Sequence, residues 1–152
     1  QGWGFAQGTP GFDRLNQALA YLNTSFFGAY APLWHALEHA EGADGEALRR
    51  YGTEKVRHVH QALEQMIGNG PWLLGGQRSL ADAYFAGIAR WNDYHQVVDR
   101  RHFPKLQQLF ERLQDDAGVQ FAHAIEAQRT VTSSGGFLGE VRLQDVLEAE
   151  AA

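Results

Sequence analysis

The sequence has 152 residues, of which 44% are hydrophobic and 20% are charged, as expected for one globular domain with a single hydrophobic core. Thirteen Lys and Arg residues against eighteen Asp and Glu residues give a formal net charge of −5. That balance argues against a nucleic-acid binder, which needs a basic face to contact phosphates. Because there is no cysteine, disulfides, thiolate metal sites and a catalytic thiol are excluded from these residues.

The first eleven residues are rich in glycine and predict an irregular lead-in or interdomain linker. Apolar residues then recur at steps of three and four from Phe12 to Leu37, which predicts one long helix over about residues 12–39. Pro32 should kink this helix, because proline removes a backbone hydrogen bond and its ring crowds the carbonyl four residues earlier. That earlier residue is Gly28, whose lack of a side chain makes a bend easier.

Two further helices are predicted in the middle of the chain. Residues 48–67 are amphipathic, with apolar side chains on one face and charged side chains on the other. Residues 80–91 are apolar almost all the way round, which predicts a buried helix at the centre of the core. Ser79 and Asp82 match a capping box at its start, so we assign both to a structural cap rather than to acid–base chemistry.

The last part of the chain predicts two more helices and a tail. Pro104 suits a first helical residue, and Asp115 or Asp116 can cap the helix that follows. Neither an internal repeat nor an alternating strand pattern is present. The predicted fold is therefore all-α, a bundle of about five helices over residues 12–128. A lead-in (1–11) precedes it, and a polar tail (129–152) with a possible short helix follows it.

Four short motifs occur in order along the chain. They are Ala31-Pro-Leu-Trp34, Pro71-Trp-Leu-Leu-Gly-Gly76, Ser79-Leu-Ala-Asp-Ala-Tyr84 with Arg90-Trp91, and Phe103-Pro104-x-Leu106. Together they resemble the C-terminal helical domain of glutathione S-transferases, most closely that of bacterial beta-type members. In that family a preceding thioredoxin-like domain binds glutathione and activates its thiol. The helical domain forms the wall of the site for the second, hydrophobic substrate.

The resemblance places this substrate wall on the second half of the first helix and the end of the third. The corresponding residues are aromatic, and we interpret them as substrate-binding: Phe27, Tyr30, Trp34, Trp91 and Tyr94. Pockets for small ligands are mostly apolar, which suits this composition. The alternative is that these rings belong to the core or to a dimer interface. Phe27, Tyr30 and Trp34 share one helix face, which we expect to be an exposed aromatic patch.

Three positions depart from the beta-type pattern. Aligned on Ala31-Pro-Leu-Trp34, the family's His-Lys pair falls on Phe27 and Gly28, and its Asn falls on Ala20. None of these side chains can hydrogen-bond glutathione, so we expect the chain to have little affinity for it. Arg78 stands just before the cap, where members usually carry an apolar residue.

Two functions from different classes are considered. The first is the substrate-binding domain of an enzyme that conjugates glutathione, its co-substrate, to a hydrophobic electrophilic small molecule. The sequence begins at Gln1 without an initiator Met, which indicates a fragment lacking the thioredoxin-like domain. We therefore expect this chain to hold no catalytic residue and to be inactive alone. The alternative is a non-catalytic helical module that binds a protein partner or sequesters a ligand.

Partners and location follow from the same reading. The family resemblance implies a homodimer. No apolar run is long enough to span a membrane and no signal peptide is visible, so we expect a cytoplasmic protein without membrane or nucleic-acid partners. His35 and His39 lie four residues apart, but no third ligand follows, so no metal is predicted. His58 and His60 point to different helix faces. Asn92, Asp93 and His95 are expected at a solvated helix end.

Overall fold

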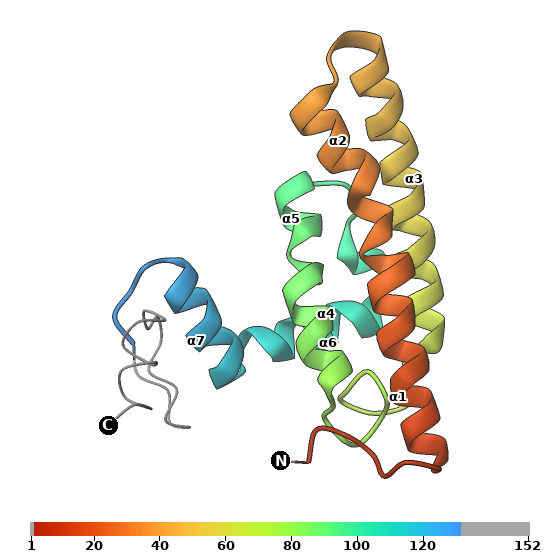
Figure 1. Cartoon of the computed structure of the whole chain (residues 1–152), viewed down its shortest axis with the longest axis vertical. Helices are drawn as coiled ribbons and strands as arrows, with labels where there is room; N and C mark the ends of the chain where they lie inside the picture. The colour runs from red at the N-terminus through yellow and green to blue at the C-terminus, as the bar shows by residue number, and fades with distance from the viewer. Residues whose placement is uncertain (1, 132–152) are drawn as a thin grey trace, which may run out of the picture. The chain divides into compact units, whose positions relative to one another are not determined.

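The computed structural model describes residues 2–131, which fold as helices joined by loops (Figure 1). Within that range no β-strand occurs, only an isolated bridge between Trp72 and Gly75. The α-helices are α1 (Pro10–Tyr21), α2 (Ala31–His39), α3 (Gly42–Met66), α4 (Leu80–Ala89), α5 (Trp91–His95), α6 (Pro104–Gln114) and α7 (Ala117–Glu126). The five predicted helices correspond to α1 with α2, α3, α4 with α5, α6 and α7. The predicted all-α class is confirmed.

The predicted long helix over residues 12–39 changes helix type in its middle. A π-helical turn covers Leu22–Phe26, and a 3₁₀ turn covers Gly28–Tyr30, before α2 begins. In the π-helical turn the Phe27 N–H donates to the Leu22 carbonyl at 2.8 Å. Pro32 has no N–H for the Gly28 carbonyl, which instead accepts the N–H of Ala31. The distortion expected from Pro32 is therefore spread over residues 22–30.

Helix α3 runs alongside α1 and α2 (Figure 1). The Tyr21 hydroxyl donates to the Val59 carbonyl at 3.1 Å, which ties α1 to α3. A Cβ atom at Gly52 would meet the Leu33 side chain at 2.7 Å, so only glycine allows α2 to approach α3 this closely. At the far end of α3, the Glu64 carboxylate accepts the N–H groups of Lys105 and Leu106, both at 3.0 Å, and so caps α6.

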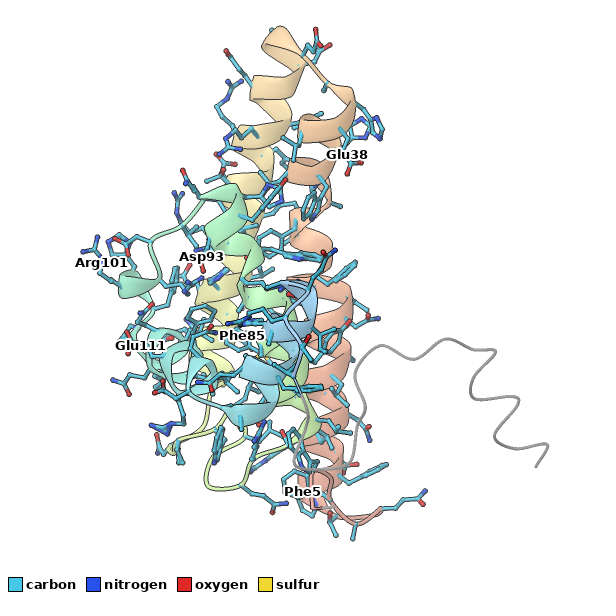
Figure 2. All side chains as sticks on the ribbon, turned by 90° about the vertical axis from the view of Figure 1, so that its left-hand side faces the viewer. Phe5, Glu38, Phe85, Asp93, Arg101 and Glu111 are labelled. Carbon is cyan, nitrogen blue, oxygen red and sulfur yellow. The ribbon has the colours of Figure 1, made fainter. Side chains whose placement is uncertain are left out.

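Helix α4 supplies much of the buried core, as predicted. Phe85 is fully buried in the interior (Figure 2), and Ala81, Ala86 and Ile88 are buried with it. Leu80 and Ala83 are exposed, so the helix is not buried all the way round. The largest side chains of the core come from every part of the first 113 residues: Leu22, Phe26, Tyr30, Leu33, Leu63, Leu73, Phe85, Leu106 and Leu113.

The start of α4 is a capping box between Ser79 and Asp82. The Asp82 carboxylate accepts the Ser79 N–H at 2.8 Å and the Ser79 hydroxyl at 3.0 Å. Its other oxygen accepts the Leu73 N–H at 2.8 Å. Both Ser79 and Asp82 are completely buried, so every one of these bonds is shielded from water.

The lead-in also contacts the start of α4. The Trp3 carbonyl accepts the N–H of Leu80 at 3.0 Å, and the Gln77 side chain donates to the Gly2 carbonyl at 3.0 Å. The Arg78 guanidinium lies over the Trp3 ring at 4.0 Å and near the Trp72 ring at 5.6 Å. Arg78 stands where family members usually carry an apolar residue. Its guanidinium packs against the aromatic rings of Trp3 and Trp72 instead.

The chain divides into two compact units, residues 1–113 and residues 114–152. In the described part of the second unit, the Asp116 side chain accepts the N–H groups of Gly118 and Val119 and caps α7. Residues 129–131 are not helical. The short helix predicted in the tail otherwise falls on residues 132–152, which lie outside the described residues.

Candidate functional site

Aromatic side chains from two segments meet in the first unit. Phe27 and Tyr30 come from the distorted stretch before α2, Trp34 comes from α2, and the rest come from α5. Trp91 is the centre, with ring centroids 5.0 Å from Phe27, 5.6 Å from Tyr30 and 5.5 Å from Trp34. The Tyr94 ring stacks on Trp34 at 5.1 Å. We name these five residues, together with His95, the aromatic cluster.

The structure brings together all five residues predicted to bind substrate, but they differ in exposure. Phe27 is 46% exposed and Tyr94 is 63% exposed, whereas Trp34 and Trp91 are half-buried. Tyr30 is 0% exposed. The expectation that Tyr30 shares an exposed patch with Phe27 and Trp34 is therefore wrong. Its position in the 3₁₀ turn directs the ring inward against Phe26 and Trp91, and burial raises the pKa of its phenol.

Asn92 and His95 are buried, so the expectation of a solvated helix end is wrong for both. The Asn92 side chain donates to the Val98 carbonyl at 2.8 Å and accepts the Val98 N–H at 3.0 Å. These two bonds close the loop after α5, whose C-cap residue Gln96 lies in the left-handed region with φ 52°. Asn92 is thus a structural residue that holds α5 in place.

His95 is a member of the cluster that sequence reasoning did not select. Its ring lies 4.4 Å from Trp34 and 6.0 Å from Tyr30, and it is 4% exposed. Its Nε2 atom makes no hydrogen bond within the described part of the chain. Burial lowers the pKa of the imidazole, and the nearby Arg49 guanidinium lowers it further. The four-residue step from Trp91 to His95 was the available signal, because it places both on one helix face.

An ion pair between Asp93 of α5 and Arg100 links this helix to the segment that follows it. Both Asp93 oxygens accept from the Arg100 guanidinium, at 2.6 and 2.7 Å. Arg100 also donates to the Ala89 carbonyl at 3.1 Å, and its guanidinium lies over the Phe110 ring at 3.8 Å. A bidentate pair fixes orientation as well as charge. The ring positions on α5 are therefore held by contacts outside the cluster.

The helical stretch that carries Phe27 offers few polar groups at the positions where the family binds glutathione. Ala20 and Phe27 are exposed, and Gly28 is half-buried, but none of the three has a polar side chain. Asn23, four residues before Phe27, belongs to a polar pair, because its side chain accepts from the Tyr84 hydroxyl at 2.6 Å. Nothing in the sequence pattern predicted this pair, because its members are 61 residues apart.

The histidines outside the cluster do not converge. The rings of His35 and His39 are 5.2 Å apart on the exposed face of α2. His58 is exposed, whereas His60 is buried with its Nδ1 atom 2.8 Å from the Val56 carbonyl. Over residues 2–131 no three His, Cys, Asp or Glu side chains are grouped so as to hold a metal ion. The helices in this range are also too short or too polar to cross a membrane.

The aromatic cluster is mostly apolar. A wall of half-buried indoles with two exposed rings at its edge offers apolar contact and stacking to a planar or hydrophobic ligand. Its buried titratable groups are the Tyr30 phenol and the His95 imidazole. The cluster is thus an aromatic surface that is exposed at Phe27 and Tyr94 and buried at Tyr30 and His95.

Comparison with known proteins identifies the family. Residues 20–115 match the family model for the C-terminal domain of glutathione S-transferase. The chain therefore belongs to the glutathione S-transferase C-terminal domain family, as the sequence motifs indicated. No match was found among curated protein sequences.

Solved structures of glutathione transferases share the fold. The enzyme from Methylococcus capsulatus is 28% identical with a TM-score of 0.65, over 84% of this chain and 60% of its own. The enzyme from Xylella fastidiosa is 28% identical with a TM-score of 0.67, over 76% of this chain and 56% of its own. The bacterial transferase BphK, solved as a ternary complex, is 22% identical with a TM-score of 0.70, over 82% of this chain and 59% of its own. The chain thus spans about three fifths of the length of these transferases.

Proposed function

We propose that this chain is the hydrophobic-substrate-binding domain of a glutathione transferase-like enzyme that conjugates glutathione to electrophiles. The aromatic cluster is the observation that carries the proposal. Its exposed members, Phe27 and Tyr94, contact the electrophile, and the indoles of Trp34 and Trp91 form the wall behind it. Tyr30 and His95 support the wall from inside and do not reach the ligand, because both are buried.

The chemistry itself is assigned to a thioredoxin-like domain outside these residues. There glutathione loses its thiol proton, and the thiolate sulfur attacks the electrophilic carbon, forming a C–S bond as the leaving group departs with its electron pair. This chain contributes position, since holding the electrophile against a fixed wall lowers the entropic part of the barrier. Two similar structures, from a sphingomonad and from Sulfitobacter, were solved with glutathione, which supports glutathione as the co-substrate. A cytoplasmic bacterial homodimer is part of the same proposal.

A non-catalytic module of the same fold remains the second candidate. One observation favours it: Ala20, Phe27 and Gly28 present no polar side chain where beta-type enzymes contact glutathione. Such a module would use the aromatic cluster to sequester a ligand or to bind a protein partner.

Binding of 1,3-dinitrobenzene, an unreactive analogue of the electrophile, to residues 1–152 tests the proposed substrate wall. Quenching of tryptophan fluorescence measures this binding. Phe27→Ser and Tyr94→Ser should each weaken binding. Tyr51→Ser is the matched control, because Tyr51 is 53% exposed on α3 and belongs to no part of the cluster. Equal affinity of all three variants for 1,3-dinitrobenzene would overturn the proposal that Phe27 and Tyr94 contact the substrate.

A second measurement tests whether these residues lack glutathione contacts. Titration calorimetry of residues 1–152 with glutathione should give no binding tighter than about 1 mM, an affinity that corresponds to roughly −4 kcal/mol. The gene sequence upstream of Gln1 then discriminates between the enzyme and the non-catalytic module. A thioredoxin-like pattern with a cis-proline and an early Ser, Cys or Tyr supports the enzyme, and its absence supports the module.

A further inference from the structure

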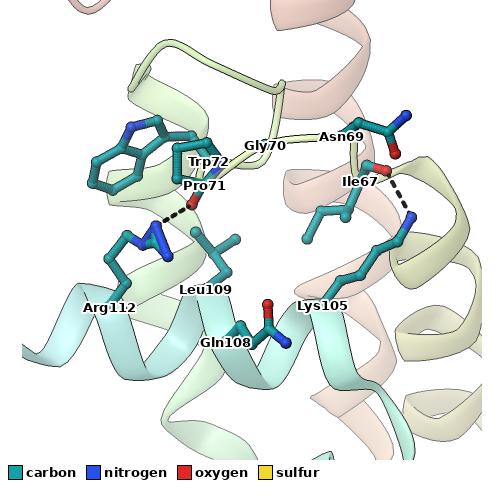
Figure 3. A pocket seen from close by; sticks show the side chains of 10 residues that line it. Ile67, Asn69, Gly70, Pro71, Trp72, Lys105, Gln108, Leu109 and Arg112 are labelled. Atoms are coloured by element: carbon teal, nitrogen blue, oxygen red, sulfur yellow. Dashed lines mark hydrogen bonds between the residues drawn. The ribbon is translucent and has the colours of Figure 1, made fainter.

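A hollow of about 200 Å³ lies between α6 and the loop that connects α3 to α4 (Figure 3). One side is the face of α6 that carries Lys105, Gln108, Leu109 and Arg112, at steps of three and four residues. The other side is formed by residues 67–72 of the loop. None of the hollow belongs to the aromatic cluster, so it is a separate feature of the fold.

The charge of this hollow is entirely positive. Lys105 and Arg112 line it, and no carboxylate is among its lining residues, although the whole chain carries a net charge of −5. Each cation makes one long hydrogen bond to a loop carbonyl: Lys105 to Ile67 at 3.3 Å and Arg112 to Pro71 at 3.3 Å. A lysine ammonium has three donors and a guanidinium has five, so both keep donors for a ligand.

The two cations stand at opposite ends of the hollow. They are seven residues apart on α6, which separates their backbones by about 10 Å along the helix axis. Between them lie the Gln108 amide and the Leu109 side chain, as Figure 3 shows, with the Trp72 ring beside Arg112. The site therefore offers positive charge at each end and apolar surface with one amide in the middle.

The loop wall is fixed before any ligand arrives. Trp72 and Gly75 exchange backbone hydrogen bonds at 3.0 and 2.9 Å, and the Gly68 N–H donates to the Leu73 carbonyl at 3.2 Å. A Cβ atom at Gly70 would lie 2.5 Å from the Gly75 carbonyl, so the loop backbone closes on itself at that point. A preformed wall lowers the ordering cost of binding.

We infer that this hollow binds a small dicarboxylate, an organic acid with a carboxylate at each end of a short apolar chain. Lys105 pairs with one carboxylate and Arg112 with the other, while the half-buried Trp72 ring contacts the methylene chain and Gln108 donates to either end. A monocarboxylate of the same length satisfies only one cation, so the site selects for two charges. The inference is independent of the proposed transferase function.

Titration calorimetry of residues 1–152 with glutarate and with pentanoate, in low-salt buffer, tests this inference. The two probes have the same number of carbons and differ in one carboxylate. Glutarate should bind saturably and at least about tenfold more tightly than pentanoate, as expected for one extra charge-assisted contact. Raising the salt concentration should weaken glutarate binding.

Variants locate the site. Lys105→Gln and Arg112→Gln should each weaken glutarate binding by about tenfold or more, and Arg112→Lys, which keeps the charge but loses the planar guanidinium, should weaken it less than Arg112→Gln. Arg50→Gln is the matched control, because Arg50 is exposed on α3 away from the hollow. Thermal melts of all variants check that each is folded. Equal affinity for glutarate and pentanoate, no saturable binding, or binding unchanged in both Gln variants would overturn the site.

Discussion

The Leu73 N–H donates to the Asp82 carboxylate at 2.8 Å, nine residues away across the loop. The same carboxylate accepts the N–H and the hydroxyl of Ser79 through its other oxygen. One buried side chain thus caps α4 and also anchors the loop that precedes it. The loop wall of the hollow beside α6 depends on the same anchor, because Leu73 follows Trp72 directly.

Replacing this carboxylate should be costly. In Asp82→Ala the cap is lost, at about 1 kcal/mol, and the buried donors of Leu73 and Ser79 are left unpaired, at about 1–3 kcal/mol each. We expect the free energy of unfolding to fall by roughly 3 kcal/mol or more, measured by urea denaturation. Asp13→Ala is the control, an exposed carboxylate in the first turn of α1, and should cost less than about 1 kcal/mol. Similar losses in both variants would contradict the anchoring role.

The sequence predicted features that depend on a few neighbouring residues. The Ser79-x-x-Asp82 spacing, Pro104 at a helix start and an aspartate before α7 are all local patterns, and the structure has helices beginning at each. The five aromatic residues predicted to bind substrate were also predictable as a set, because the family resemblance points to the two helix segments that carry them. Their individual exposure was not predictable, since it depends on how α2 and α5 meet.

Specific side-chain partners account for what the sequence did not predict. The sequence indicates that Asn92 is a polar residue at a solvated helix end. In the structure its side chain is buried and hydrogen-bonds the backbone of Val98. Arg78 reads as a departure from an apolar pattern, yet it lies over Trp3, 75 residues earlier in the chain. In each case a specific partner satisfies the polar side chain, and periodicity carries no information about that partner.

Substitutions at Tyr30, Phe27 and Tyr94 should distinguish a core ring from exposed rings of the aromatic cluster. Tyr30→Ser removes a fully buried ring and should lower the free energy of unfolding by about 3–5 kcal/mol. Phe27→Ser and Tyr94→Ser remove exposed rings and should each cost less than about 1 kcal/mol. Tyr30→Phe should change stability by less than about 1 kcal/mol, because its hydroxyl has no hydrogen-bond partner within residues 2–131. A stable Tyr30→Ser variant in chemical denaturation would show that the ring does not belong to the core.

His60 should make stability depend on pH. Its Nδ1 atom donates to the Val56 carbonyl, so the buried neutral ring carries its proton there. Burial lowers the pKa of His60 from 6.5 to about 4. Between these two values the unfolded chain binds a proton that the folded chain does not, so stability is full above pH 6.5 and is lost as the pH falls toward 4. The loss attributable to His60 is roughly 3 kcal/mol at pH 4.

Urea denaturation between pH 7 and pH 4 measures this slope. His60→Asn keeps an amide N–H near the Val56 carbonyl but does not titrate, so its stability should fall less steeply than that of the native chain. His58→Asn, on the exposed side of α3, should keep the native slope. Carboxylates contribute equally to all three proteins, so the difference between slopes isolates His60. Parallel slopes for the native chain and His60→Asn would exclude a role for this histidine.

Arg78 should hold the lead-in against α4. The Leu80 amide donates to the Trp3 carbonyl at 3.0 Å, so its hydrogen exchange reports whether residue 3 stays in place. Arg78→Ala removes the guanidinium that lies 4.0 Å from the Trp3 ring, a contact of about 1 kcal/mol at a partly exposed site, and should speed Leu80 exchange by about fivefold. Arg112→Ala is the matched control, because Arg112 also lies near Trp72, at 5.8 Å, and has no contact with Trp3. Exchange at Leu80 should be native in that variant. Unchanged exchange in Arg78→Ala would instead assign the lead-in's position to the hydrogen bond between Gln77 and Gly2, and Gln77→Ala would then be the variant that releases it.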